Sequence, residues 1–189
     1  MSPVRADTLC FEDVASGEVL PELSVPLTRS LIVATAIASR DYQDVHHDPG
    51  LAIDRGSPDI FMNILSTNGF VGRFVTDWAG PAARIEAVSI RLGAPNYPGD
   101  TMVLSGTVTA RELPDTRLDG SGVVTVSVRG TNGRGDHVTG TVRVTLPLRE
   151  GTATGVRATG VRATGVRATG VDGATPSSTT SDAGTASGA

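Results

Sequence analysis

The sequence SPDIFMNILSTNGFVGRFVTDWAGP occupies residues 57–81 and is the most strongly patterned stretch of the chain. Its apolar residues recur at near-helical spacing, which predicts one long amphipathic helix. Ser57 is a suitable N-cap, and Pro58 suits the first helical position. Gly80 followed by Pro81 predicts the end of the helix. At 1.5 Å per residue such a helix would be about 30 Å long, enough to cross a small domain.

The residues after this helix alternate between apolar and polar side chains, as strands with one buried face do. Apolar residues share one face in four successive runs, over residues 88–92, 102–108, 124–128 and 138–146. An earlier extended segment, residues 18–27, contains two prolines that mark it as an edge strand. Turns rich in Gly, Asn, Asp and Pro separate the runs, so we predict an antiparallel sheet of about five strands.

One long apolar helix and about five antiparallel strands bury their apolar faces best when the sheet wraps around the helix. We therefore predict an α+β protein with a single hotdog fold, in which the sheet surrounds a long central helix. Such a sheet keeps open edges, and these favour pairing with a second hotdog.

The 189 residues are long enough for one ordinary domain, which we assign to residues 18–150. Residues 1–17 are expected to be a flexible lead-in. Residues 151–189 contain no Leu, Ile, Met or aromatic residue, and they repeat the unit Gly-Val-Arg-Ala-Thr three times. Because this composition buries too little apolar surface to offset its ordering entropy, we predict a disordered low-complexity tail.

The composition excludes several classes of function. All 16 basic residues are arginines, which rules out a Walker-type phosphate loop and Schiff-base lysine chemistry. The net charge of -4, without a basic run, disfavours nucleic-acid binding. Cys10 is the only cysteine and fits a reducing cytoplasm, and the three histidines lack the clustering of a zinc site, so we predict no metal site. No apolar run reaches the roughly 18 residues of a membrane span, so we expect a cytoplasmic protein.

Asp41 and His46 are the residues best suited to chemistry. They lie five residues apart in the polar stretch 40–48, which has no apolar period and is expected to be a loop. Asp48 followed by Pro49 predicts the start of a short helix after it. A carboxylate and an imidazole at this spacing can share one water for general acid–base catalysis. Spacing alone leaves open a helix-capping aspartate and a surface histidine.

The run DYQDVHHDP, residues 41–49, resembles the hydratase motif of MaoC-like (R)-specific enoyl-CoA hydratases, Asp-x-Asn-Pro-(Leu/Ile)-His-x-Asp-Pro. Four positions match this motif: Asp41, His46, Asp48 and Pro49. Two positions depart from it: Gln43 and Asp44. The resemblance covers residues 18–148, including PGD at 98–100. The resemblance implies that Asp41 and His46 are the catalytic pair and that the substrate is an acyl-CoA. Coenzyme A then enters only as part of the substrate, and no separate cofactor is expected.

The resemblance also bears on Asn63. The family has a glycine here, whose backbone N–H points at the thioester oxygen. Since the N–H survives the substitution, the resemblance implies that the Asn63 N–H is the oxyanion donor. The alternative is a helix residue whose side chain hydrogen-bonds locally.

Three segments, residues 40–48, 59–65 and 75–81, resemble more specifically the small catalytic subunit of two-subunit enoyl-CoA hydratases of bacterial steroid side-chain degradation. That resemblance implies a steroid enoyl-CoA substrate and a role in lipid metabolism, in the catabolism of steroids such as cholesterol. It further implies a heteromer with a larger hotdog subunit that lacks the catalytic pair and carries a DUF35-type domain. A homodimer is the alternative assembly.

The predicted function is therefore that of a hydro-lyase, and two other functions remain open. A hotdog acyl-CoA thioesterase would need a carboxylate on the long helix, which offers only Asp59 near its start and Asp77 near its end. A non-catalytic hotdog subunit that completes a partner's pocket would have no use for Asp41 and His46 at this spacing.

Overall fold

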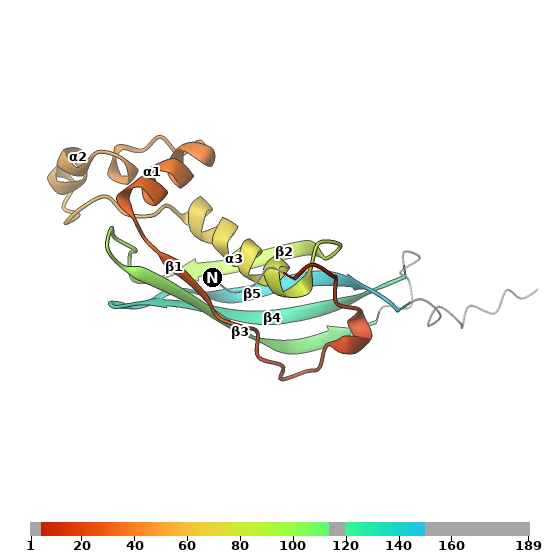
Figure 1. Ribbon diagram of the computed structural model, residues 1–189. Coiled ribbons are helices and arrows are strands. Elements are labelled where there is room, and N and C mark those ends of the chain that lie inside the picture. The colour runs from red at the N-terminus through yellow and green to blue at the C-terminus, as the bar shows by residue number, and fades with distance from the viewer. Residues whose placement is uncertain (1–4, 114–119, 150–189) are drawn as a thin grey trace, which may run out of the picture. The chain divides into compact units, whose positions relative to one another are not determined.

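The computed structural model describes residues 5–113 and 120–149, and the predicted α+β hotdog fold is confirmed (Figure 1). Five antiparallel strands form one sheet in the order β1-β3-β4-β5-β2, and the long helix α3 lies along one face of it. The strands are β1 (Leu23–Pro26), β2 (Arg84–Leu92), β3 (Thr101–Glu112), β4 (Ser121–Asn132) and β5 (Gly135–Pro147). The short β1 and the exposed β2 are the two edges.

The buried face of the sheet follows the predicted alternation. Apolar residues at every second position of the three central strands are buried, among them Leu104, Val126 and Val142. Val126 pairs with Val108 on one side and with Val142 on the other, so these side chains line up across the sheet. Gly106 lies in the same face, where an added Cβ would be 2.9 Å from the ring of Phe74. A glycine is needed there because α3 packs closely against β3.

Helix α3 (Ile64–Ala79) begins six residues later than predicted, and the predicted N-cap Ser57 and length of about 30 Å are wrong. Its 16 residues correspond to about 24 Å, Asn63 is its N-cap, and it ends at Gly80 as expected. Tertiary hydrogen bonds hold residues 57–62 outside the helix. The backbone N–H of Phe61 donates to Val45 O, and that of Met62 donates to Asn96 O.

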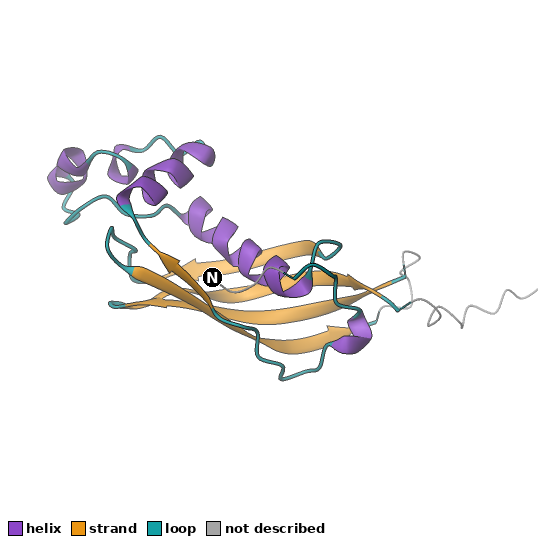
Figure 2. Ribbon diagram, viewed as in Figure 1, coloured by secondary structure: helices purple, strands orange, loops and turns teal. Residues whose placement is uncertain are grey.

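Two short helices and a 3₁₀ turn gather beyond one end of the sheet (Figure 2): α1 (Arg29–Ala38), η2 (Asp44–His46) and α2 (Pro49–Asp54). Thr28 caps α1 by accepting a hydrogen bond from Leu31 N. Asp48 caps α2 in the same way, which confirms the predicted start of that helix. The polar stretch 40–48 is not wholly a loop, because η2 forms inside it.

Residues 5–17 are packed against the domain, whereas the sequence predicts a flexible lead-in. Leu9, Phe11 and Val14 belong to the hydrophobic core, and Leu9 N donates to Ala79 O. The Phe11 ring lies directly over Gly122, where any Cβ would overlap it. The predicted tail over residues 151–189 lies outside the described residues. In the described ranges, no helix combines the length and the hydropathy of a membrane span.

Candidate active site

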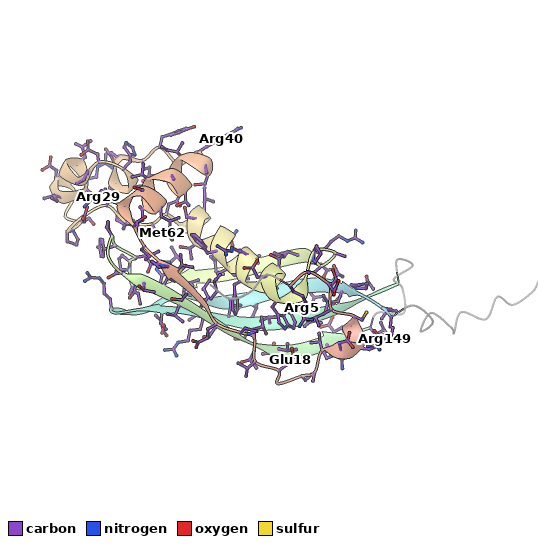
Figure 3. All side chains as sticks on the ribbon, viewed as in Figure 1. Arg5, Glu18, Arg29, Arg40, Met62 and Arg149 are labelled. Carbon is purple, nitrogen blue, oxygen red and sulfur yellow. The ribbon has the colours of Figure 1, made fainter. Side chains whose placement is uncertain are left out.

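Asp41 is positioned by the end of helix α1. The N–H of Arg40 donates to Ile37 O at 3.0 Å, and the N–H of Asp41 donates to Ala36 O at 2.9 Å, which is the pattern of a Schellman motif. Arg40 occupies the left-handed position of that motif with φ of 58°, and its side chain points outward (Figure 3). The tight turn directs Asp41 from the helix terminus back toward α3.

His46 is held in one orientation by the segment that leads into α3. Its Nδ1 lies 2.7 Å from Phe61 O, and because a carbonyl only accepts, Nδ1 carries the hydrogen. The Phe61 ring packs edge-on against the imidazole with 5.0 Å between centroids. The side chain of His46 is only 7% exposed, so the alternative of a surface histidine is wrong.

The predicted pair is brought together. Asp41 Oδ2 lies 3.4 Å from His46 Nε2, and the Asp41 side chain is 19% exposed. With the hydrogen on Nδ1, a neutral imidazole presents a lone pair at Nε2. Two acceptors then face one point, an arrangement that suits a water molecule donating one hydrogen bond to each.

Asn63 touches Asp41 directly. Its Oδ1 accepts from Ser66 N at 2.9 Å, which caps α3, and its Nδ2 donates to Asp41 Oδ2 at 2.9 Å and to Ser39 Oγ at 3.0 Å. The local hydrogen bonding considered for Asn63 therefore occurs. Its backbone N–H has no acceptor within residues 5–113 and 120–149, so it also remains available to a ligand.

The carboxyl of Asp41 is biased toward its ionised form. The hydrogen bond from Asn63 is the main cause that holds the pKa of Asp41 below its ordinary value. Burial acts in the opposite direction, while the backbone N–H of Gln43 and the neighbouring His46 lower the pKa further. Asp41 is thus ionised at neutral pH, which is the form that can act as a base.

The pair opens into a cavity of about 360 Å³. Its polar wall contains Asp41, Gln43, His46, Asn63 and His137, and its remaining lining is mostly apolar: Val45, Phe61, Met62, Ile64, Leu92, Gly93 and Pro95. Met62 lies where the helical cluster, made up of α1, η2 and α2, meets the sheet (Figure 3). Asn63 and Ile64 belong to the N-terminal end of α3, where backbone N–H groups carry the positive end of the helix dipole. An apolar group with one oxygen that gains negative charge fits this lining.

Sequence reasoning missed the far wall of the cavity. His137 on β5 is 1% exposed, its Nδ1 donates to Ala94 O at 2.7 Å, and its Nε2 lies 2.8 Å from Thr67 Oγ1. Burial lowers the pKa of His137, so the ring is neutral. The sequence signal for this wall is the glycine at position 93. A Cβ there would clash with Asp136 O, so a glycine is what lets the two segments lie this close.

The carboxylates that a thioesterase would need are engaged elsewhere. Asp59 precedes α3 and receives two hydrogen bonds from Arg29, at 2.8 and 2.7 Å. Asp77 pairs with Arg73 at 3.1 Å, and neither aspartate lines the cavity. Among residues 5–113 and 120–149, no three His, Cys, Asp or Glu side chains form a group that could hold a metal ion.

Comparisons with known proteins found similarities in sequence and in fold. The family described as "MaoC like domain" matches residues 11–132. The chain is 50% identical over 130 residues to the 3-oxo-4,17-pregnadiene-20-carboxyl-CoA hydratase beta subunit of Mycobacterium tuberculosis, covering 69% of this chain and 95% of that protein.

Two solved structures extend the comparison. A chain of the ChsH1-ChsH2 complex from Mycobacterium tuberculosis is 50% identical with a TM-score of 0.64, over 70% of this chain and 98% of that one. The R-hydratase PhaJ1 from Pseudomonas aeruginosa is 17% identical with a TM-score of 0.65, over 75% of this chain and 88% of that one, which shows a shared fold.

Proposed function

Because the chain belongs to the family of MaoC-like domains, we propose that it adds water to the double bond of an α,β-unsaturated acyl-CoA. The observation that carries the proposal is the approach of Asp41 Oδ2 to His46 Nε2 at 3.4 Å, in the lining of a largely apolar cavity. The relative that is 50% identical to this chain is named as a hydratase of a pregnadiene carboxyl-CoA. We therefore propose a steroid side-chain enoyl-CoA as the substrate.

The two side chains would divide the proton chemistry. A water molecule donating to Asp41 Oδ2 and to His46 Nε2 turns its oxygen lone pairs toward the substrate. As that oxygen bonds to the β-carbon, Asp41 takes one water proton. His46 holds the water in place and helps pass that proton from Asp41 to the α-carbon, which returns Asp41 to its carboxylate form. General acid–base assistance of this kind is worth about 10²–10⁴ in rate.

The electrons of the double bond move onto the thioester oxygen during the attack. We propose that the backbone N–H of Asn63 stabilises this oxygen, since the N–H lies at the N-cap of α3 and is not taken by another group of the described residues. One oxyanion donor contributes about 10²–10³ in rate. Protonation of the α-carbon then restores the thioester carbonyl and yields the 3-hydroxyacyl-CoA.

The reaction needs no further reagent. Water supplies every atom that the product gains, and no net oxidation or reduction occurs. We therefore propose that coenzyme A enters only as part of the substrate and that no resident cofactor takes part.

The sole cysteine, Cys10, is free, in keeping with a cytoplasmic site of action.

We further propose that the chain is the catalytic subunit of a heteromer. Strand β2 is an exposed edge, and Ile64 and Leu65 at the start of α3 are 50% and 49% exposed. An open edge beside half-exposed apolar residues favours pairing with a second sheet. The 50% identical solved chain comes from a two-component complex, which supports a second subunit; the hotdog fold of that subunit and a DUF35-type domain on it are part of the proposal.

An absorbance assay tests the function. The purified chain is mixed with crotonyl-CoA or with a steroid enoyl-CoA, with and without the co-expressed partner, and loss of the enoyl thioester absorbance is followed. We expect hydration of the steroid substrate by the complex and little turnover by the chain alone. Release of free thiol without hydration would instead indicate a thioesterase, and activity of a tight homodimer that ignores the partner would overturn the heteromer.

A further inference from the structure

The side-chain amide of Asn63 has every hydrogen-bonding position occupied. Its two N–H groups go to Asp41 and Ser39, and its oxygen receives the N–H of Ser66 and contacts the Ser66 hydroxyl. Rotating the amide by half a turn would place its oxygen against the Asp41 carboxylate and its NH₂ against an N–H group. Since Asn63 is 2% exposed, water cannot relieve those repulsions, and the orientation of the amide is fixed.

Helix capping does not explain why this residue is asparagine. Serine and aspartate cap helix N-termini about as well, and glycine costs only a few tenths of a kcal/mol. What distinguishes asparagine is that it accepts from the helix and donates to Asp41 at the same time. An aspartate would repel Asp41, and a serine hydroxyl is too short to serve both Ser66 N and Asp41 Oδ2.

The amide donates to the carboxylate oxygen that does the chemistry. Asp41 Oδ2 is both the acceptor for Asn63 Nδ2 at 2.9 Å and the oxygen 3.4 Å from His46 Nε2. We propose that the Asn63 side chain is a positioning group for hydration, which holds Asp41 Oδ2 where it shares the attacking water with His46. This role rests on the hydratase function proposed above and is separate from that of the Asn63 backbone N–H.

The same contact favours the ionised carboxylate. The groups that contact the Asp41 carboxyl within the described residues are the backbone N–H of Gln43, the amide of Asn63 at the N-cap of α3 and the imidazole of His46 in η2, and of these only His46 is titratable. Loss of the amide donor should therefore raise the pKa of Asp41, which is otherwise held down mainly by Asn63. The fall of kcat/KM on the acidic side of the pH–rate profile, its acid limb, reports this rise in the pKa of Asp41.

The test uses the complex with its partner subunit and compares Asn63→Asp with Asn63→Ser. Both variants keep a capping oxygen and the backbone N–H, so we expect the start of α3 to persist, with a larger fall in melting temperature for Asn63→Asp, where two buried carboxyls meet, than for Asn63→Ser. In Asn63→Asp two carboxyls face each other, and the acid limb of kcat/KM should move up by about one pH unit or more. In Asn63→Ser we expect kcat to fall about 10-fold to 100-fold, with a smaller upward movement of the limb.

Ser66→Ala is the matched control, because it alters the other side of the same amide and leaves the contact with Asp41 intact. Its acid limb should stay at the wild-type pH. Wild-type acid limbs and kcat in both Asn63 variants would overturn the positioning role. A wild-type complex that hydrates no enoyl-CoA would instead overturn the proposed function, so the two failures are distinguishable.

Discussion

Two buried histidines line the same cavity and are oriented by the same device. Nδ1 of His46 and Nδ1 of His137 each donate to a backbone carbonyl at 2.7 Å, from Phe61 and Ala94 respectively. They differ at the other nitrogen. Nε2 of His46 faces the Asp41 carboxylate at 3.4 Å, whereas Nε2 of His137 lies 2.8 Å from the hydroxyl of Thr67.

The difference separates a reactive imidazole from a structural one. A carbonyl bond at Nδ1 fixes the ring and the tautomer but does not decide what Nε2 does. At His137 the hydroxyl of Thr67 satisfies Nε2 and ties β5 to the first turn of α3. At His46 the lone pair stays open to a water shared with Asp41, so burial alone does not identify the catalytic histidine.

The largest effect is expected from Asp41→Asn, which removes the base from the His46 side of the cavity. The amide oxygen introduced by this substitution would still accept from Asn63 Nδ2, so the fold should persist. We expect kcat/KM for hydration to fall by about 10²–10⁴, as measured by enoyl thioester absorbance with the partner present. Near-normal turnover would show that another group takes the water proton.

His46→Asn removes Nε2 but keeps an amide N–H close to the position of Nδ1, where it can still donate to Phe61 O. We expect hydration to fall by about 10²-fold or more, with a small change in melting temperature. The stability should hold because, among the residues that the structure describes, the one polar approach of His46 Nε2 is that to Asp41 at 3.4 Å. A large loss of stability with retained turnover would reverse the roles of the two histidines.

His137→Asn is the matched change on the other side of the cavity. It keeps the donor to Ala94 O and deprives Thr67 of its acceptor, so we expect a loss of about 1–3 kcal/mol in the free energy of unfolding. Thr67 can turn to Asn63 O at 3.3 Å, which favours the lower end of that range. Urea unfolding measures the loss, and the enoyl-CoA assay should show a smaller effect on turnover than His46→Asn does.

The smallest expected effect is a pH dependence of stability due to His137. Burial lowers the pKa of His137 in the folded state, while a histidine in the unfolded chain has a pKa of about 6.5. Below that pH the unfolded chain binds a proton that the folded protein does not, so stability is full above about pH 6.5 and declines as the pH falls toward the folded pKa. Melting temperatures at several pH values should show a shallower decline in His137→Asn, and identical slopes in both proteins would contradict the assignment.

Much of the fold was predictable because it depends on local pattern. The alternation in residues 102–108 and 124–128 placed the buried face of the sheet correctly, since the period of a strand is two. The cap at Asp48 was predictable for the same local reason. The start of α3 was not, because Phe61 and Met62 donate to acceptors far away in the sequence, and these bonds override the helical period.

The candidate site divides in the same way. Asp41 and His46 were found from their spacing and from the motif around them, because both belong to one short segment. The place of His137 in the cavity wall was not predicted, since nothing around it in the sequence shows that β5 runs beside the first turn of α3. The flexible lead-in was expected for residues 1–17, whereas Phe11 is buried against Gly122, a glycine more than 100 residues away.

Local sequence was sufficient for the α+β class, the five strands, the paired Asp41 and His46 and the family to which the chain belongs, because periodicity and motif spacing are properties of neighbouring residues. The groups that surround that pair were decided by tertiary packing. Asn63 lies 22 residues from Asp41 and Thr67 lies 70 residues from His137, yet each pair is within hydrogen-bonding distance. Such contacts arise from packing α3 against the sheet and the helical cluster, and the orientation and charge of a buried side chain follow from its neighbours in space.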